Sequence, residues 1–478
     1  MDNTLIFLSP VDVITFDPGM VGDIYSSQVI ENIFEGLTRY KNGTIKIKPG
    51  LSERWNMYDN GRRWVFILRR GVKFHNGESF NAASVVSSFS TRLNNKKKYK
   101  EWNTSYTYLK SVREIDNYTV EFLLTEPYAP FLYRLASTNA SIIAPSSYDG
   151  EDFSPIGTGP FRFGERKQGK FVKILRNNTY WDKRPLLSAV IFKVVKNQNW
   201  RILQLENGKA DAALLESEIF IEDVSRGKKL RIISGRSPGI YYIAFNMRKG
   251  PFRDKRMRQA VAHLIKKEAV IKKIFQSFAE NATSPVPPQM FGHNPELKDY
   301  SFNIKEAKRK LYEAGYKSEV DVSLYYSDNS ESLENIANVL SRSARKIGLN
   351  IKRIPVPFSE LVNIGYGRHD MLILGWIGDI PDADVYLYPN FIGKSSKFNS
   401  SGYKNPVVSK LLNKARMTSD IELRKKIYLE VQRILHEDLP WLPLYYRNDL
   451  LIHNKNVSNL TIQPLSLLNF SDVFFNNN

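Results

Sequence analysis

The chain has 478 residues, more than one hydrophobic core usually holds, so we expect at least two lobes. Hydrophobic residues make up 42% and aromatic residues 12% of it, which excludes a disordered protein. Cysteine is absent, which excludes disulfides and thiolate metal sites. The net charge of +20 would suit nucleic acid or an anionic membrane, but neither a basic tail nor a groove-reading motif accompanies it. We interpret the charge as a lysine-rich solvated surface.

The first half of the chain is rich in strand patterns. Leu5–Leu8 predicts a buried strand, and Thr119–Leu124 alternates apolar and polar residues like a half-buried one. Residues 157–163 and 171–175 flank a polar, glycine-bearing turn and predict a hairpin. Further apolar runs at 191–195 and 240–245 predict more strands.

After Asn246 the patterns alternate between helix and strand, and the tail from Leu460 to Phe475 is extended again. We therefore predict mixed α/β lobes and a chain that leaves the first lobe and returns to it. The expected elements are a helix capped by Asp254, a helix over 333–347 ended by Gly348, a strand over 350–354, and a helix opened by a capping box of Ser419 and Glu422.

Two apparent catalytic motifs do not survive inspection. Gly235-Arg-Ser237-Pro-Gly239 matches a nucleophile elbow, but the residue after the serine must donate a backbone N–H, and Pro238 has none. Residues 164–170 resemble a phosphate loop but lack its closing Ser or Thr and join two strands, so we expect a solvated turn. We predict that the protein is not an enzyme.

No metal-binding pattern emerges from the six histidines, because no two of them lie three or four residues apart. We expect neither a fixed structural metal site nor a cofactor. No run reaches the roughly 18 apolar residues of a membrane span. No charged and then apolar leader precedes the first strand, so an exported protein would be present here in its mature form.

One stretch, residues 64–82, resembles nearly residue for residue the signature of bacterial extracytoplasmic solute-binding proteins of the peptide/nickel class, family 5. Six further stretches, in the same order as in that family, extend the resemblance over nearly the whole chain. They are residues 156–161, 176–181, 205–211, 246–260, 375–382 and 439–446.

The resemblance implies a two-lobed periplasmic-binding-protein-like fold of type II, cluster C, with a hinge. It places lobe I at 1–245 with an inserted subdomain at about 35–175, lobe II at 246–454, and a return to lobe I at 455–478. It also implies a monomer, periplasmic or at the cell surface, that closes on a small charged ligand and delivers it to the membrane permease of an ABC importer.

Peptide binders of this family anchor the ligand ammonium with an aspartate just after a Gly-Trp stretch. Asp379 matches that aspartate, Trp376 is expected to wall the pocket, and Asp382 belongs to the same motif. The dipeptide-binding branch also uses an arginine for the ligand carboxylate, and Ser327 falls at that place. Serine cannot supply the charge, so a strict dipeptide binder is disfavoured.

The nickel-binding branch is the other comparison. Residues 93–102 resemble its segment before the ligand-facing tryptophan, so Trp102 is expected either to lie against a flat metal–amino-acid chelate or to be buried. That branch's carboxylate-binding arginine falls near Thr138, and its metal-touching histidine falls near Ser395. The ligand set of this branch is therefore not carried over intact.

We therefore expect no direct protein ligand to a metal, which would arrive already coordinated by small organic molecules such as histidine. Arg236 is the candidate carboxylate partner on position alone. Tyr25, Ser26 and Ser27 match a segment that lines the ligand site in the family.

Trp102 and Ser327 make a nickel(II)–amino-acid chelate our preferred ligand, with a di- or oligopeptide as the close alternative. A basic adaptor for nucleic acid or membrane is the remote alternative; it predicts an affinity that falls steeply with salt. We expect no nucleic-acid partner.

Overall fold

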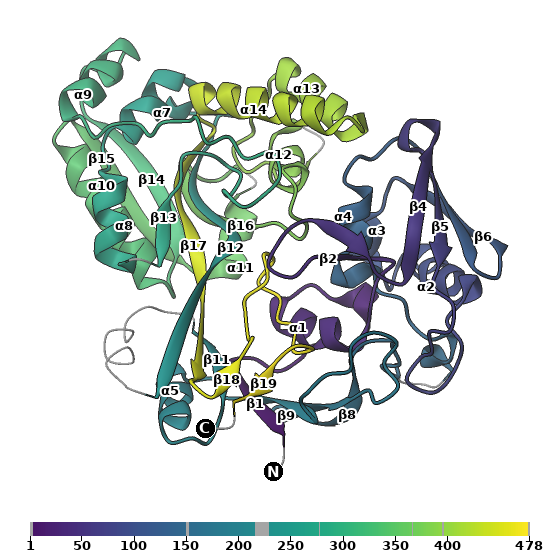
Figure 1. The fold of residues 1–478 in the computed structure, drawn as a ribbon. Helices are drawn as coiled ribbons and strands as arrows, with labels where there is room; N and C mark the ends of the chain where they lie inside the picture. Colours follow the sequence, from purple (N-terminus) through teal and green to yellow (C-terminus); the bar gives the residue numbers. More distant parts are fainter. Residues whose placement is uncertain are drawn as a thin grey trace. The chain divides into compact units, whose positions relative to one another are not determined.

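The structure is a computed structural model that describes residues 3–149, 153–215, 229–276, 278–365, 367–393 and 396–476. The chain divides into two compact units: unit 1 is Met1–Gly235 with Asp449–Asn478, and unit 2 is Arg236–Asn448. It passes between them inside β12 (Leu230–Phe245) and returns inside β17 (Trp441–Asn454) (Figure 1). The boundaries expected at Asn246 and Asn454 lie at the C-terminal ends of these same strands, and the hinge itself stays a prediction.

In unit 1 a mixed sheet surrounds the first strand, β1 (Thr4–Ser9). β1 runs parallel to β10 and β11, and the predicted hairpin of β8 and β9 extends the sheet in antiparallel fashion. α1 (Ile24–Ile33) packs Val29, Ile30 and Ile33 into the core beneath it. The remaining bounds are β8 Phe161–Lys167, β9 Phe171–Arg176, β10 Ala189–Val194, α5 Gln198–Glu206 and β11 Ala212–Leu215.

Unit 1 also contains a four-stranded antiparallel sheet, with its own aromatic-rich core, inside the range expected for an inserted subdomain. In β5 (Arg63–Leu68) every second residue is buried, so Trp64, Phe66 and Leu68 face that core. Asn81 and Ser84 form a capping box that starts α2 (Ala82–Asn94). The other elements are β2 Thr38–Tyr40, β3 Ile47–Pro49, β4 Ser52–Tyr58, α3 Lys100–Ser105, β6 Leu109–Asp116, β7 Thr119–Leu124 and α4 Phe131–Leu135.

Three signature stretches of unit 1, residues 64–82, 156–161 and 176–181, meet at the C-terminal end of α1. Glu35 accepts hydrogen bonds from Thr158 Oγ1 at 2.9 Å, Tyr180 OH at 2.8 Å and Trp181 Nε1 at 2.7 Å. The backbone N–H of Gly159 donates to the carbonyl of Ile33 at 2.9 Å. A Cβ on Gly159 would lie only 2.7 Å from that carbonyl oxygen, so the approach requires glycine. These stretches therefore hold α1 in place.

His75, in the first signature stretch, joins the same group. Its backbone N–H donates to Gly157 O at 2.9 Å, its Nδ1 accepts from Gly157 N at 3.2 Å, and its Nε2 lies 3.0 Å from Gly159 O. Because Nδ1 is an acceptor, the ring is neutral and Nε2–H donates. Burial lowers the pKa of His75 to about 4.

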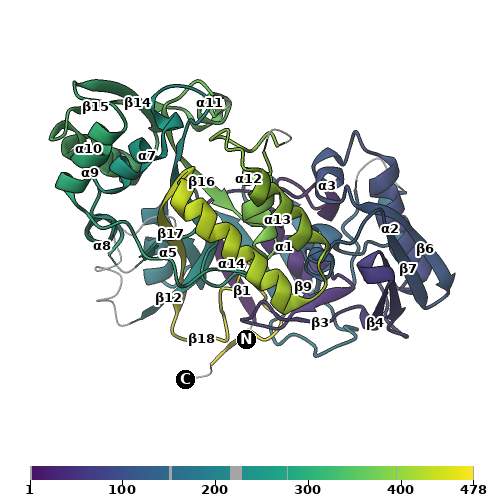
Figure 2. The same cartoon turned by 90° about the horizontal axis from the view of Figure 1, so that it is seen from above.

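Unit 2 is built on a sheet in the order β15-β14-β16-β12-β17, with a short strand, β13 (Ala279–Asn281), on β17. α10 lies beside β14 and β15, and α13 lies beside α14, in both views (Figures 1 and 2). The bounds are α7 Lys255–Ala262, α8 Lys267–Phe275, α9 Ile304–Glu313, β14 Val320–Ser327, α10 Glu331–Arg345, β15 Leu349–Val356, α11 Phe358–Ile364, β16 Met371–Ile377, α12 Asp384–Phe391, α13 Pro406–Met417 and α14 Ile421–Asp438.

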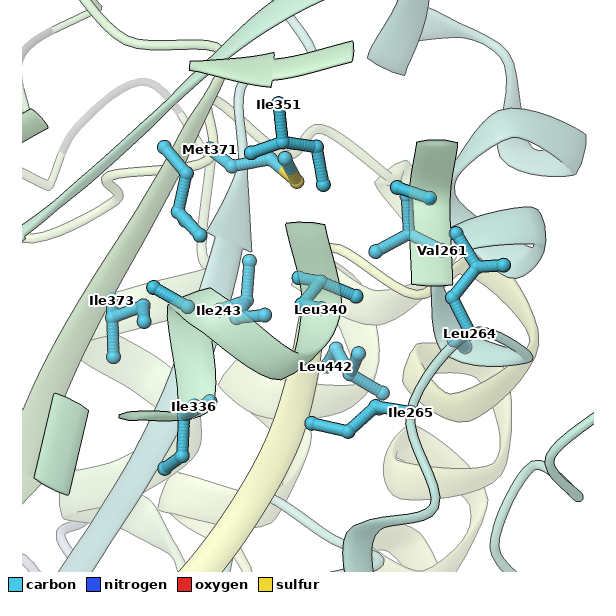
Figure 3. Packing of buried hydrophobic residues seen from close by; sticks show 14 of the residues in the cluster. Ile243, Val261, Leu264, Ile265, Ile336, Leu340, Ile351, Met371, Ile373 and Leu442 are labelled. Carbon is cyan, nitrogen blue, oxygen red and sulfur yellow. The ribbon is translucent and has the colours of Figure 1, made fainter. Parts of the chain in front are cut away.

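The core of unit 2 lies between this sheet and its helices (Figure 3). Leu340 of α10 packs among side chains from strands and from the α7 segment that are far apart in sequence. The buried residues labelled there are Ile243, Val261, Leu264, Ile265, Ile336, Leu340, Ile351, Met371, Ile373 and Leu442. Both units mix helix and strand, which confirms the predicted α/β class.

Several local predictions are confirmed and two are refined. Asp254 caps α7, and Gly348 ends the helix before β15 with φ of +83°. The cap of α14 is Asp420 rather than Ser419, because its Oδ1 accepts from the backbone N–H groups of Glu422 and Leu423. In β7 the polar face is buried as well: Glu121 is only 3% exposed because Arg63 and Arg113 pair with it.

Lowering the pH should destabilise the fold through His75. An unfolded histidine binds a proton below about pH 6.5, whereas folded His75 binds one only below about pH 4. Between these values the unfolded state holds more protons, so stability falls with pH. When the pH is lowered from 6.5 to 4.5, we expect the unfolding free energy of His75→Asn, measured by urea unfolding, to fall by roughly 2 kcal/mol less than that of wild type. Between pH 7.5 and 8.5 the unfolding free energies of the two proteins should change with pH at the same rate. The same rate in the acidic range as well would contradict a hydrogen-bonded, neutral His75 ring.

Candidate ligand-binding site

The first predicted segment forms the first turn of α1. Asp23 caps the helix by accepting from Ser26 N, and Ser27 Oγ donates to Asp23 O at 2.7 Å. Ser26 is fully buried, with its Oγ accepting from Ile14 N at 3.0 Å, so its hydroxyl serves the local fold. Tyr25 and Ser27 are half-buried.

Thr138 lies in a short 3-10 helix, η3 (Thr138–Ala140), that packs beside α1. Its Oγ1 donates to Glu31 Oε2 at 3.0 Å, and Glu31 follows Ser27 by one helical turn. The structure thus brings Ser27 and Thr138 to the same side of α1, with Glu31 between them. Sequence reasoning missed Glu31, because a glutamate on an amphipathic helix is ordinarily solvated.

Glu31 has an unusual environment for a carboxylate. Burial and the neighbouring charge of Glu35 raise the pKa of Glu31 to about 7, although the bond from Thr138 opposes the rise. Among the described residues no Lys, Arg or His nitrogen forms an ion pair with it. Glu35, which follows the end of α1, is the charged group near it, and η3 carries no charged residue.

Trp102 is 2% exposed and lies inside the aromatic core of unit 1. Its ring is stacked on Tyr106 with centroids 4.1 Å apart, Phe89 meets it edge-on, and its Nε1 donates to Asn139 O at 3.0 Å. Neither the ring face nor the N–H remains for a ligand. Of the two alternatives left open for Trp102, the structure supports burial.

Arg236 already has a partner within unit 2. Its guanidinium makes a two-pronged ion pair with Glu280, with nitrogen–oxygen distances of 2.8 and 3.1 Å. The side-chain amide of Gln289 donates hydrogen bonds to the backbone carbonyls of Arg236 and Ser237. The structure does not support Arg236 as a free carboxylate partner, because a ligand would have to displace Glu280. The rejected elbow serine, Ser237, lies within β12 and not at a strand-to-helix turn.

Trp376 and Asp379 lie at the end of β16 and just after it. Trp376 is half-buried, its Nε1 donates to Val385 O at 2.9 Å, and Phe398 packs edge-on against its ring. Asp379 is exposed. Ser327, at the end of β14, is 6% exposed and bonds to Asn329 at 2.7 Å. Of these three side chains, Asp379 is the exposed one.

Asp382 belongs to the fold and not to a ligand site, which corrects our inclusion of it. It is fully buried, and its Oδ1 accepts from Arg424 Nη2 and, at 2.9 Å, from the backbone N–H of Asp384. Asp384 in turn pairs with Arg416 at 3.0 Å. These ion pairs attach the start of α12 to α13 and α14. Ser395, where the nickel branch has its histidine, lies outside the described residues.

The histidines serve the backbone. Each has one ring nitrogen bonded to a main-chain carbonyl oxygen, at 2.7 to 3.1 Å. Within the part of the chain that the structure describes, no three His, Cys, Asp or Glu side chains come together as a metal site would require.

With this geometry in hand, the chain can be compared with known proteins. A sequence model of bacterial extracellular solute-binding proteins, family 5, matches residues 46–398. The chain belongs to this family. Among the described residues no helix combines the length and apolar character needed to cross a lipid bilayer.

Similar proteins match over almost the full length. The dipeptide-binding protein of Escherichia coli K12 is 27% identical, covering 98% of this chain and 94% of that one. Di/tripeptide-binding protein 2 of Pseudomonas aeruginosa is 29% identical, covering 96% and 92%. An ABC transporter-associated periplasmic binding protein from Helicobacter pylori, in complex with peptide STSA, is 28% identical with a TM-score of 0.83, covering 99% and 98%.

Other family members carry different ligands in their names. Relatives at 27% and 28% identity are called glutathione-binding and heme-binding proteins. The Brucella suis protein NikA, in complex with Fe(III)-EDTA, superimposes with a TM-score of 0.89 over 99% of this chain, but its 23% identity shows the fold alone. All of these relatives are named as binding proteins or carry no enzymatic name, which supports a non-enzymatic role. The family and the two-lobed α/β fold class are confirmed.

The two neighbouring aspartates should respond differently to the same substitution. Asp382→Asn leaves Arg424 buried without its counter-charge, which should cost about 3–5 kcal/mol of unfolding free energy. Asp379→Asn, at an exposed position, should cost less than about 1 kcal/mol. Urea unfolding of both variants measures this, and equal losses would contradict the separation of the two roles.

Glu31 should make the ligand-free protein less stable at alkaline pH. The folded pKa of Glu31, about 7, lies above the unfolded value near 4.3. The protonated group therefore stabilises the folded state at low pH, and this stabilisation is lost as the pH rises through about 7. We expect Glu31→Gln and wild type to match at pH 4.5 and the variant to be about 1–3 kcal/mol more stable at pH 8. A constant difference across this range would contradict the raised pKa.

Proposed function

We propose that this chain is the substrate-binding component of an ABC importer that captures short peptides outside the cytoplasmic membrane. The observation that carries the proposal is the full-length match to di- and tripeptide-binding relatives together with the peptide-bound Helicobacter pylori structure. The same proposal includes delivery of the peptide to a membrane permease and a monomeric state. It also includes a location either in the periplasm or, through a lipid anchor, at the cell surface.

The geometry supports a peptide over the nickel(II) chelate that the sequence favoured. Two residues expected in the chelate site are engaged elsewhere: Trp102, which favoured the chelate, is enclosed by its own core, and Arg236, the candidate carboxylate partner, is paired with Glu280. Asp379 is exposed, three residues after the half-buried Trp376. A carboxylate suits an ammonium group, because the two form a charge-assisted hydrogen bond.

The proposed peptide would be held by its terminal ammonium, which Asp379 would bind. Ser327 is buried and bonded to Asn329, so it does not replace the carboxylate-binding arginine of the dipeptide branch. This favours peptides whose carboxylate needs no fixed arginine at that position.

Calorimetry with tripeptides and with their N-acetylated forms tests this assignment. Asp379→Asn and N-acetylation should each lower affinity about 10- to 100-fold, since each removes one partner of a charge-assisted bond. Together they should cost little more than either alone, because they break the same interaction. Asp321→Asn, an exposed carboxylate on β14 of the same unit, is the matched control and should leave affinity unchanged.

Additive losses would contradict the role of Asp379. Tight binding of nickel with histidine, and of no peptide, would return the chelate to first place. An affinity that falls steeply with salt for nucleic acid or anionic vesicles, without any small ligand, would instead favour the basic adaptor.

A further inference from the structure

Among the described residues, Glu31 lacks the counter-charge that the most deeply buried carboxylates of this protein have. Four Asp or Glu residues are fully buried in the described part of the chain, and each lies within 4.0 Å of a cationic nitrogen. These are Asp17 with Lys98, Glu121 with Arg113, Asp382 with Arg424 and Asp384 with Arg416.

Glu35, one turn after Glu31, is satisfied too. Its two oxygens accept from three side chains, and Arg39 lies 3.9 Å away. Glu31 has only the Thr138 hydroxyl, at 3.0 Å, and no cation among the described residues. This is notable in a chain with 69 Lys and Arg against 49 Asp and Glu.

A partly desolvated carboxylate without a counter-charge is costly, since a single hydroxyl replaces only a small part of its hydration. Such a group is expected where an external cation completes the site. Glu31 is half-buried, so one side of it remains open to solvent. It lies between Ser27 and Thr138, two positions that the sequence analysis assigned to the ligand site on independent grounds.

We propose that Glu31, with the Thr138 hydroxyl, forms a cation-recognising subsite on unit 1 that takes the ammonium or guanidinium group of a lysine or arginine side chain of the transported peptide. The proposal rests on the peptide-binding function and deepens it, because it selects basic peptides within that class. Thr138 orients the carboxylate, and the negative charge of Glu35 adds to the attraction. Asp379 is a separate carboxylate on unit 2 and would take the terminal ammonium.

The test compares peptides that differ only in one charge. Lys-Ala-Ala, Ala-Lys-Ala and Ala-Ala-Lys are titrated at pH 8 against their norleucine counterparts, which keep the length of the side chain and lack its ammonium. For wild type we expect at least one lysine peptide to bind about tenfold or more tightly than its norleucine partner. Glu31→Gln should bring that preference within about threefold and leave the norleucine peptides unchanged.

Two further variants guard the interpretation. Glu53→Gln removes the same charge from an exposed position of unit 1, on β4, and should keep the lysine preference. Thr138→Val removes the hydroxyl but not the charge, so part of the preference should survive. Circular dichroism and thermal unfolding establish that each variant is folded before titration.

The failures are distinguishable. If peptides bind wild type without a lysine preference, or if the preference survives Glu31→Gln, the subsite is wrong while the peptide function stands. If no peptide binds, the proposed function fails. Thermal unfolding in butylammonium chloride is then compared with thermal unfolding in sodium chloride at equal ionic strength, to test whether Glu31 binds an ammonium group. Stabilisation of wild type but not of Glu31→Gln would support the subsite, and equal effects would overturn it.

Discussion

The carboxylate of Glu35 is the point on which the architecture of unit 1 depends. Thr158 comes from one stretch of the chain and the adjacent Tyr180 and Trp181 from another, and all three donate to it. Gly159 closes against the last carbonyl groups of α1 in the same place. A buried network of this kind is stable only when every member is satisfied, because a lone buried polar group is costly. It fixes the helix whose opposite end carries Tyr25 and Ser27.

The same arrangement explains what part of the family signature encodes. Three of the stretches by which the sequence resembles the family, residues 64–82, 156–161 and 176–181, meet at Glu35, His75 and the glycines beside them. These stretches describe the packing around α1, whereas the stretch at 375–382 carries Trp376 and Asp379, which the proposed ligand site uses. A strong family assignment therefore left the ligand open, and the full-length relatives named for peptides are the basis of the peptide proposal.

Local patterns predicted local structure well and partnerships poorly. Alternation predicted β7, an aspartate cap predicted α7, and an apolar stripe ended by a glycine predicted α10, because each signal lies within a few residues. The errors concern long-range pairs: Asp382 meets Arg424 42 residues away, and Arg236 meets Glu280 44 residues away. Glu31 and Thr138 are 107 residues apart, and the sequence around neither residue predicts their contact. A side chain's availability depends on such partners, and the sequence does not disclose them.

The close passage of Gly159 over α1 has a consequence for how proteins of this architecture diversify. Since an added methyl group there would collide with main-chain atoms, that junction tolerates almost no variation. Ile377, at the end of β16, and Asp379, just after it, are by contrast exposed and leave room for other side chains. New cargo preferences would therefore arise by exchanging such exposed side chains around a joint whose packing admits no larger residue, and exchanging them between relatives is a natural route to redirecting what such a binding protein carries.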